Sequence, residues 1–380
     1  MVRPARPVGR PATGVEEVIR QRVAECADQW FPGTGARPHV RLRRLVDRPR
    51  AVLYAVHVGD RTARPQVLAK VRRGWSDAVR DVGARPRLTP SLLPASEQTA
   101  LEFTGLAAVQ AMFGNGNPEF GAVRPLDHLA DHDAVLMEYV SAPTLRDVLV
   151  GASRFSPRIG RRARGDEETW RRAGAWLRVF QQQMPAAGLP VRQATRDDVV
   201  DRFEAFGGFL TDRLGRRAAG EAVRSGARLA ADVLPARLPL AVGHGDYAPR
   251  NVFLLEDDRL VVFDPLTRWR VPRVEDLCRF LVALRMQGLQ LHTHGAAYSA
   301  EDLDRRERAV IDGYRGDGAL PAEELRCHQL LITLDKWAAL VDSPSRSIPG
   351  KVRSASLRAA SGYLRRETER LVRLVGSEPG

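Results

Sequence analysis

Three polar residues near residue 250 have the types and the spacing of a phosphoryl-transfer site. Asp246 follows a short apolar run, Asn251 lies five residues further on, and Asp264 comes thirteen residues after that. Asn251 and Asp264 stand at the two ends of a predicted hairpin, 252–263, which brings them together. A carboxylate and an amide oxygen that meet at a strand end are hard ligands suited to Mg²⁺. The spacing therefore predicts a metal site at Asn251 and Asp264, with Asp246 left over as a base.

Transfer of a phosphoryl group requires metal ions on the phosphates, a cation, and a carboxylate that orients the attacking hydroxyl. Asparagine occurs only three times in the chain, and Asn115 and Asn117 belong to a turn, so Asn251 stands out. Lysine is equally rare in an arginine-rich chain, and Lys70 lies on a predicted strand. A lysine is a compact point charge that can meet a single phosphate oxygen. Lys70 is the candidate phosphate ligand.

The first third of the chain is expected to form a small lobe of five antiparallel strands with one helix. A helical spacing predicts a preceding helix over 14–31. Alternating apolar residues and turn signals predict the remaining elements. The expected strands are 40–45, 51–58, 66–71, 120–123 and 134–139, and the expected helix is 96–113, with Ser96 as its N-cap.

After Val140 the sequence pattern becomes mainly helical. Between the first two predicted helices, residues 153–165 are basic, low in apolar content and expected to form a mobile surface loop. The expected helices are 144–150, 167–183, 197–214, 218–234, 275–286, 302–314, 322–341 and 351–375, and short strands are expected at 240–242, 252–255 and 260–263. The chain is thus expected to have an α+β, bilobal fold of the protein-kinase type.

The motif His244-Gly245-Asp246-x-x-x-x-Asn251 followed by Asp264, together with the strand 67–70 and the segment 136–145, resembles the aminoglycoside phosphotransferase and choline kinase family. The resemblance covers residues 40–375. It implies a division into an N-terminal extension (1–38), a nucleotide-binding lobe (39–140) and a catalytic and substrate lobe (141–380).

The resemblance also implies roles for particular residues. Asp246 would be the catalytic base, and Asn251 and Asp264 the Mg²⁺ ligands. Lys70 would contact the α- and β-phosphates of ATP and be held by Glu102, although Glu97 competes for that ion pair. The hinge that pairs with adenine would be the backbone of Glu138, Tyr139 and Val140. A buried Asp276 would hydrogen-bond the catalytic loop, and His244 would shape that loop.

The sequence departs from the family pattern at three places. Ala248 stands where many members have a histidine, Pro265 stands where an aromatic residue is common, and the turn 46–50 contains no glycine to cradle phosphates. These departures leave the nucleotide open, so that GTP is not excluded beside ATP.

The segment between Asp264 and Asp276 holds only eleven residues, too few for a platform that binds peptide substrates. We therefore expect a small-molecule hydroxyl acceptor, a sugar or glycan intermediate in preference to an aminoglycoside. The acidic candidates for binding a polycation are Glu301, Asp302, Asp304, Glu323 and Glu324. The alternative is a kinase-like pseudoenzyme that acts as a nucleotide-binding or scaffold protein.

The composition excludes several other classes. The net charge of +13 is almost all arginine, scattered without interleaved aromatic residues, so nucleic acid is not an expected partner. Three distant cysteines indicate neither disulfides nor a zinc site. No apolar run could span a bilayer and no secretory signal is evident, so a cytoplasmic protein is expected. A basic helix with leucines at 357, 364 and 371 could touch a membrane, although packing on the large lobe is the favoured interpretation.

Overall fold

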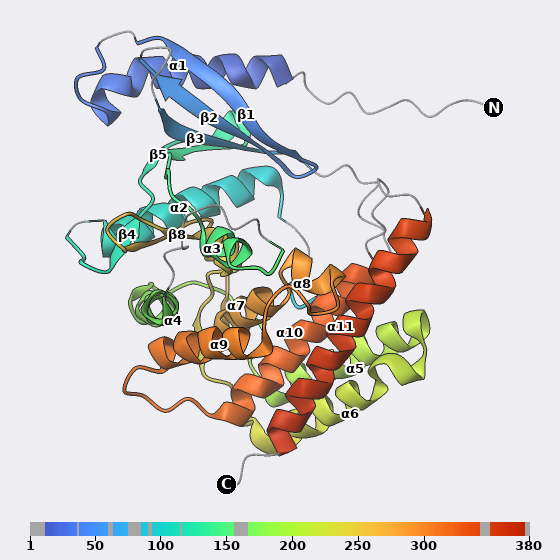
Figure 1. The fold of residues 1–380 in the computed structure, drawn as a ribbon. Helices are drawn as coiled ribbons and strands as arrows, with labels where there is room; N and C mark the ends of the chain where they lie inside the picture. Colours follow the sequence, from blue (N-terminus) through green and yellow to red (C-terminus); the bar gives the residue numbers. More distant parts are fainter. Residues whose placement is uncertain are drawn as a thin grey trace. The chain divides into compact units, whose positions relative to one another are not determined.

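The structure, a computed structural model, describes residues 12–35, 38–59, 64–74, 85–89, 93–114, 116–155, 166–342 and 350–376. The chain divides into two compact units (Figure 1). Unit 1 holds residues 1–81, 92–117 and 121–141, and unit 2 holds 82–91, 118–120 and 142–380. The expected mobile loop at 153–165 lies mostly outside the described residues.

Unit 1 contains a five-stranded antiparallel sheet in the order β1-β2-β3-β6-β5. Its strands are β1 (Val40–Arg48), β2 (Ala51–Val58), β3 (Pro65–Arg72), β5 (Pro125–Leu129) and β6 (Ala134–Glu138). The expected number of strands is correct, but one member was wrong. Strand β4 (Phe120–Ala122), expected in this sheet, is not part of it, and β5, which the sequence analysis missed, forms its edge.

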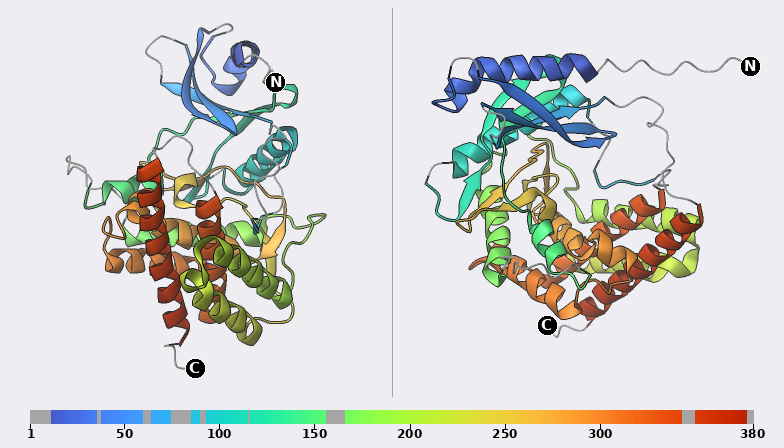
Figure 2. Two further views of the ribbon diagram at one scale, coloured as in Figure 1. Left: turned by 90° about the vertical axis from the view of Figure 1, so that its right-hand side faces the viewer. Right: turned by 45° about the horizontal axis from the view of Figure 1, so that its top comes forward.

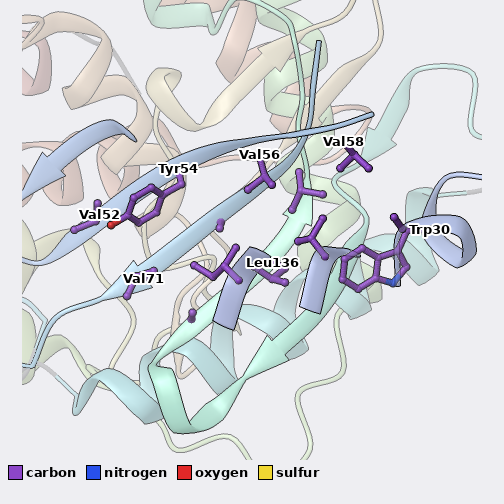
Figure 3. Close-up of a cluster of buried hydrophobic side chains, with 13 residues drawn as sticks. Trp30, Val52, Tyr54, Val56, Val58, Val71 and Leu136 are labelled. Carbon is purple, nitrogen blue, oxygen red and sulfur yellow. The ribbon is translucent and has the colours of Figure 1, made fainter. Parts of the chain in front are cut away.

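One face of the sheet is covered by helix α1 (Ala12–Trp30), which lies beside the sheet in both views of Figure 2. Ile19 and Val23 are fully buried against strand residues that alternate along β2, β3 and β6. The cluster in Figure 3 includes Trp30, Val56 and Leu136. Because side chains alternate between the faces of a sheet, the intervening residues point to the opposite face.

That opposite face is covered by α2 (Ala95–Phe113), which contacts β3, β5 and β6. The expected N-cap at Ser96 was wrong: the cap position is Pro94, without a side-chain hydrogen bond, and Ser96 lies inside the first turn. Proline's fixed φ is compatible with this position, and the first-turn N–H groups of α2 receive no side-chain cap there. A 3₁₀ turn, η2 (Ala130–His132), joins β5 to β6.

Unit 2 has two small β-structures beside its helices. The hairpin β8 (Val252–Leu254) and β9 (Leu260–Val262) is as expected, and its second strand is bonded to Glu119, whose carbonyl accepts from the Leu260 N–H at 3.0 Å. Strand β7 (Leu240–Val242) pairs with β10 (Arg270–Pro272), a strand that the sequence analysis missed.

The helices of unit 2 agree with the expected ones to within two residues at every end, and α8 is additional. They are α3 (Leu145–Gly151), α4 (Glu167–Gln183), α5 (Arg196–Leu214), α6 (Arg216–Val233), α7 (Glu275–Arg285), α8 (Gly288–His292), α9 (Ala300–Arg315), α10 (Ala322–Asp342) and α11 (Gly350–Gly376). Thr144 and Thr195 form capping boxes at the starts of α3 and α5. Helices α4 and α9 approach so closely that a Cβ on Gly313 would lie 1.8 Å from the Arg171 carbonyl oxygen.

The C-terminal helix α11 packs against α10, and Leu364 and Leu371 on its apolar stripe are buried. This packing agrees with the favoured interpretation of that stripe. Among the described residues, no helix is long and apolar enough to cross a membrane.

Candidate functional site

The loop that carries Asp246 begins directly after β7. Hydrogen bonds to Asp276, at the start of α7, hold this loop in place. The Asp276 carboxylate accepts hydrogen bonds from the backbone N–H of His244 at 2.5 Å and of Gly245 at 3.3 Å. These are the bonds expected for Asp276. Burial, together with the charge of Glu275, raises the pKa of Asp276 to about 6. The carboxylate therefore holds the loop most firmly above that pH, where it is charged.

An aromatic layer supports the same loop. The Tyr247 ring stacks on Trp176 with 5.5 Å between ring centroids, and its hydroxyl donates to the Ala173 carbonyl at 2.6 Å. His244 is fully buried and contacts Trp176, Phe180 and Tyr247 edge-on or tilted. Burial lowers the pKa of His244 to about 4, so the ring is neutral at pH 7. A neutral, packed imidazole suits the expected role of shaping the loop.

Asn251 joins the loop to the hairpin. Its side-chain amide donates to the Asp246 carboxylate at 3.0 Å and to the Asp246 carbonyl at 2.8 Å. These two bonds use the amide nitrogen and leave the side-chain oxygen for another partner. The Asn251 carbonyl in turn accepts from the N–H of Phe263 at 3.1 Å, one residue before Asp264. The structure thus brings Asp246, Asn251 and the backbone next to Asp264 together within unit 2.

Asp264 has a φ of 63°, in the left-handed region that residues other than glycine rarely occupy. Non-glycine residues held there cluster at functional sites. The donor set of one amide and one carboxylate oxygen fits Mg²⁺ or another hard divalent cation. Among the described residues, no group of three or more histidine, cysteine or acidic side chains is placed to hold a metal ion.

Two cations near Asp246 received no role from the sequence. Arg250 forms an ion pair with the Asp246 carboxylate, and the side chains are 45% and 37% exposed. Lys336, on α10, interacts electrostatically with Asp246 and Arg250. The rarity of lysine was the signal that could have identified Lys336, since the same rarity identified Lys70.

Unit 1 carries the other expected residues. Lys70 on β3 points away from α1 and pairs with Glu102 of α2, with 2.7 Å between the Lys70 Nζ and a Glu102 oxygen. Arg72 contacts the second Glu102 oxygen at 2.8 Å. Glu102 is fully buried, whereas Glu97 is exposed in the first turn of α2, so the ion pair forms with Glu102.

The expected hinge follows β6. The N–H groups of Glu138 and Tyr139 donate to the carbonyls of Arg124 and Gln66, each at 2.9 Å. Val140 lies beyond the sheet, and its N–H has no hydrogen bond to the rest of the described chain. Of the three residues, Val140 therefore has the backbone donor that a ligand could use.

The turn between β1 and β2 lacks glycine, as the sequence shows, and is a tight connection between Arg48 and Ala51. Asp47, beside this turn, pairs with Arg73 at 2.8 Å and with Arg44 at 2.9 Å. Charged side chains thus brace this hairpin.

Neither a protein-family model nor a curated protein sequence matches the chain. Solved structures do. A macrolide 2′-phosphotransferase type I is 14% identical with a TM-score of 0.52, over 94% of this chain and 99% of that chain. Macrolide 2′-phosphotransferase MphH from Brachybacterium faecium is 11% identical (TM-score 0.51, 90% and 97% covered). Choline kinase LicA from Streptococcus pneumoniae is 11% identical (TM-score 0.50, 92% and 100% covered).

Almost the whole length of each of these structures aligns with this chain. At such low sequence identity, the similarity shows a shared fold. The expected α+β fold with a five-stranded sheet and a mainly helical remainder is confirmed, and so is the resemblance that the motifs indicated. The chain has the protein-kinase-like fold, in the form found in macrolide phosphotransferases and choline kinases.

Proposed function

We propose that this protein is a small-molecule kinase that transfers the γ-phosphoryl group of ATP, with Mg²⁺, to a hydroxyl group of its acceptor. The proposal depends on one observation: Asn251 is hydrogen-bonded both to Asp246 and to the residue before Asp264. The loop that carries Asp246 is held by Asp276. The structural neighbours, which are phosphotransferases and a choline kinase by name, support the same reaction class.

In this proposal Asp246 accepts the proton of the acceptor hydroxyl. The hydroxyl oxygen forms a bond to the γ-phosphorus while the bond from that phosphorus to the β–γ bridging oxygen breaks, and ADP leaves. The hydrogen bond from the Asn251 amide and the ion pair with Arg250 orient the Asp246 carboxylate. The Arg250 contact must open for the acceptor hydroxyl to approach that oxygen.

Asn251 and Asp264 would hold the divalent cation, which neutralises charge on the phosphates when bound. Lys70, fixed by Glu102, would contact the α- and β-phosphates. The adenine ring would meet the backbone of Glu138, Tyr139 and Val140, and the free N–H of Val140 would be the donor. The same backbone groups could accept guanine only in another orientation, so nucleotide choice is open to a direct comparison of ATP with GTP.

A screen of a metabolite pool for a mass gain of one phosphate, dependent on ATP and Mg²⁺, tests the proposal. Asp246→Asn should abolish the gain and leave nucleotide binding intact, because Asp246 contacts the acceptor and not the nucleotide. Asp257→Asn, an exposed change in the β8–β9 turn, is the matched control and should keep full activity. Nucleotide binding without transfer to any acceptor would instead support a pseudoenzyme scaffold.

The acceptor proposed from the sequence is a sugar or glycan intermediate in preference to an aminoglycoside. Three of the five acidic candidates for binding a polycation are paired or buried, which supports this preference, whereas Glu301 and Glu323 are exposed. Asp302 pairs with Arg305, Asp304 pairs with Arg285, and Glu324 is buried.

A further inference from the structure

Lys336 lies in the middle of α10, and it is one of three lysines in the chain. Another, Lys70, is committed to Glu102. Lys336 is partly buried, and among the described residues its ammonium group has no hydrogen bond and no ion pair within 4 Å. The charges around it are Arg279, Asp335, Asp246 and Arg250. Over the described ranges, Lys336 is therefore an unpaired cation that interacts electrostatically with the proposed base.

The charges of two carboxylates, Glu275 beside Asp276 and Asp335 beside Lys336 in the sequence, are already paired with arginines. Glu275 accepts from Arg192 at 2.5 Å and from Arg279 at 2.9 Å, and all three side chains are buried. Asp335, the neighbour of Lys336 in the sequence, lies 3.5 Å from Arg85. These arginines leave Lys336 without a dedicated counter-ion in the described chain.

Asp246 is satisfied in the same way by Arg250 and Asn251. Asp276 is enclosed by the backbone of the catalytic loop. Asp246, Glu275 and Asp335 are therefore paired with arginines, whereas the Lys336 ammonium has no ion pair within the described part of the chain. A polycationic acceptor would lose its hydration here without gaining an ion pair, whereas an anionic group would gain one.

We propose that the acceptor carries an anionic oxygen group, a phosphate monoester or a carboxylate, that binds the Lys336 ammonium while the hydroxyl to be phosphorylated lies at Asp246. This inference rests on the proposed function and specifies the substrate class of the same site. Burial lowers the pKa of Lys336, and a bound anion would raise it again.

The small number of lysines makes a direct binding test possible. Reductive methylation with ¹³C-formaldehyde labels only Lys70, Lys336, Lys351 and the N-terminus, so NMR resolves each group. Spectra of the Lys336→Arg and Lys351→Arg variants assign the signals. The probes, added in the presence of ADP and Mg²⁺, are inorganic phosphate, glucose 6-phosphate, glucuronate, glucose and kanamycin.

We expect saturable shifts of the Lys336 signal with the anionic probes and none with glucose or kanamycin at equal concentration. If phosphate and glucose 6-phosphate shift the signal and glucuronate does not, the anionic group of the acceptor is a phosphate monoester. If only glucuronate shifts it, the group is a carboxylate. A Lys336 signal that moves with none of the anions, or that moves with kanamycin, overturns the inference.

Kinetics with the acceptor found by the metabolite screen give a second test. Lys336→Met should raise KM for the acceptor about tenfold or more, since a charge-assisted contact is lost, while KM for ATP stays unchanged. Lys336→Arg should keep part of the affinity, and Lys351→Met is the control. A rise in KM for ATP alone would mean that Lys336 serves the nucleotide, which contradicts the inference.

The two proposals can fail separately. Transfer to a cationic acceptor would leave phosphotransfer standing and refute the anionic class. Shifts of the Lys336 signal without transfer to any acceptor would support an anion site and refute the kinase activity.

Discussion

The substitution Glu102→Gln tests how much the buried ion pair with Lys70 stabilises the proposed nucleotide site. The Glu102 carboxylate is fully buried and accepts from two cations, Lys70 at 2.7 Å and Arg72 at 2.8 Å, whose side chains are 7% and 12% exposed. Removing one partner of a buried ion pair destabilises by about 3–5 kcal/mol, because a buried charge is left without compensation. Glutamine keeps one acceptor oxygen, so we expect about 3 kcal/mol, at the lower end of that range.

A loss of about 3 kcal/mol corresponds to more than a hundredfold increase in opening of this region. Hydrogen-exchange mass spectrometry of peptides from β3 and α2 measures that opening locally, whatever the cooperativity of the whole chain. The control is Glu97→Gln, an exposed change on the same helix, expected within about 0.5 kcal/mol. If the two variants changed exchange in β3 equally, the buried ion pair would have no special importance and the reasoning would be wrong.

The remaining predictions concern the loop that carries His244, Gly245 and Asp246. Since burial holds the pKa of His244 at about 4, below its ordinary 6.5, the wild type should lose about 3 kcal/mol of stability relative to His244→Gln as the pH falls from 6.5 to 4. Urea denaturation of both proteins at several pH values measures this difference, and a constant difference would show that the ring titrates normally. Gly245→Ala should destabilise clearly more than Gly188→Ala. Both glycines have positive φ (84° and 75°), but a Cβ on Gly245 would lie 2.9 Å from the Leu266 carbonyl oxygen, whereas a Cβ on Gly188 has no neighbour within 4 Å. Equal losses in urea denaturation would mean that the loop relaxes around the new methyl group.

The elements that the sequence predicted well are those with strong local patterns. Strand β7 and helix α4 begin and end where expected, because apolar periodicity and nearby turn residues define them. Strand β5 was missed because all five of its residues are only partly buried, so its sequence lacks a clear apolar alternation. Membership of a sheet depends on distant partners, which is why Phe120 was placed in the wrong sheet.

The same distinction applies to the candidate site. Asp246, Asn251 and Asp264 lie within 19 residues along the chain, and the β8–β9 hairpin connects Asn251 to Asp264, so their proximity could be predicted. Lys336 lies 90 residues after Asp246 in the sequence, and no local pattern connects it to the loop. The choice between Glu97 and Glu102 depended on which face of α2 meets β3, a matter of tertiary packing.

The packing of α1 has a consequence for synthesis of the chain on the ribosome. Ile19 and Val23 are buried in part against Leu136, which leaves the ribosome more than 100 residues later. At about 5–20 residues per second, the apolar face of α1 waits about 5–20 s for its last partner. During that time its apolar side chains are available to a chaperone or to another nascent chain. Folding of this unit should therefore be sensitive to translation speed between α1 and β6.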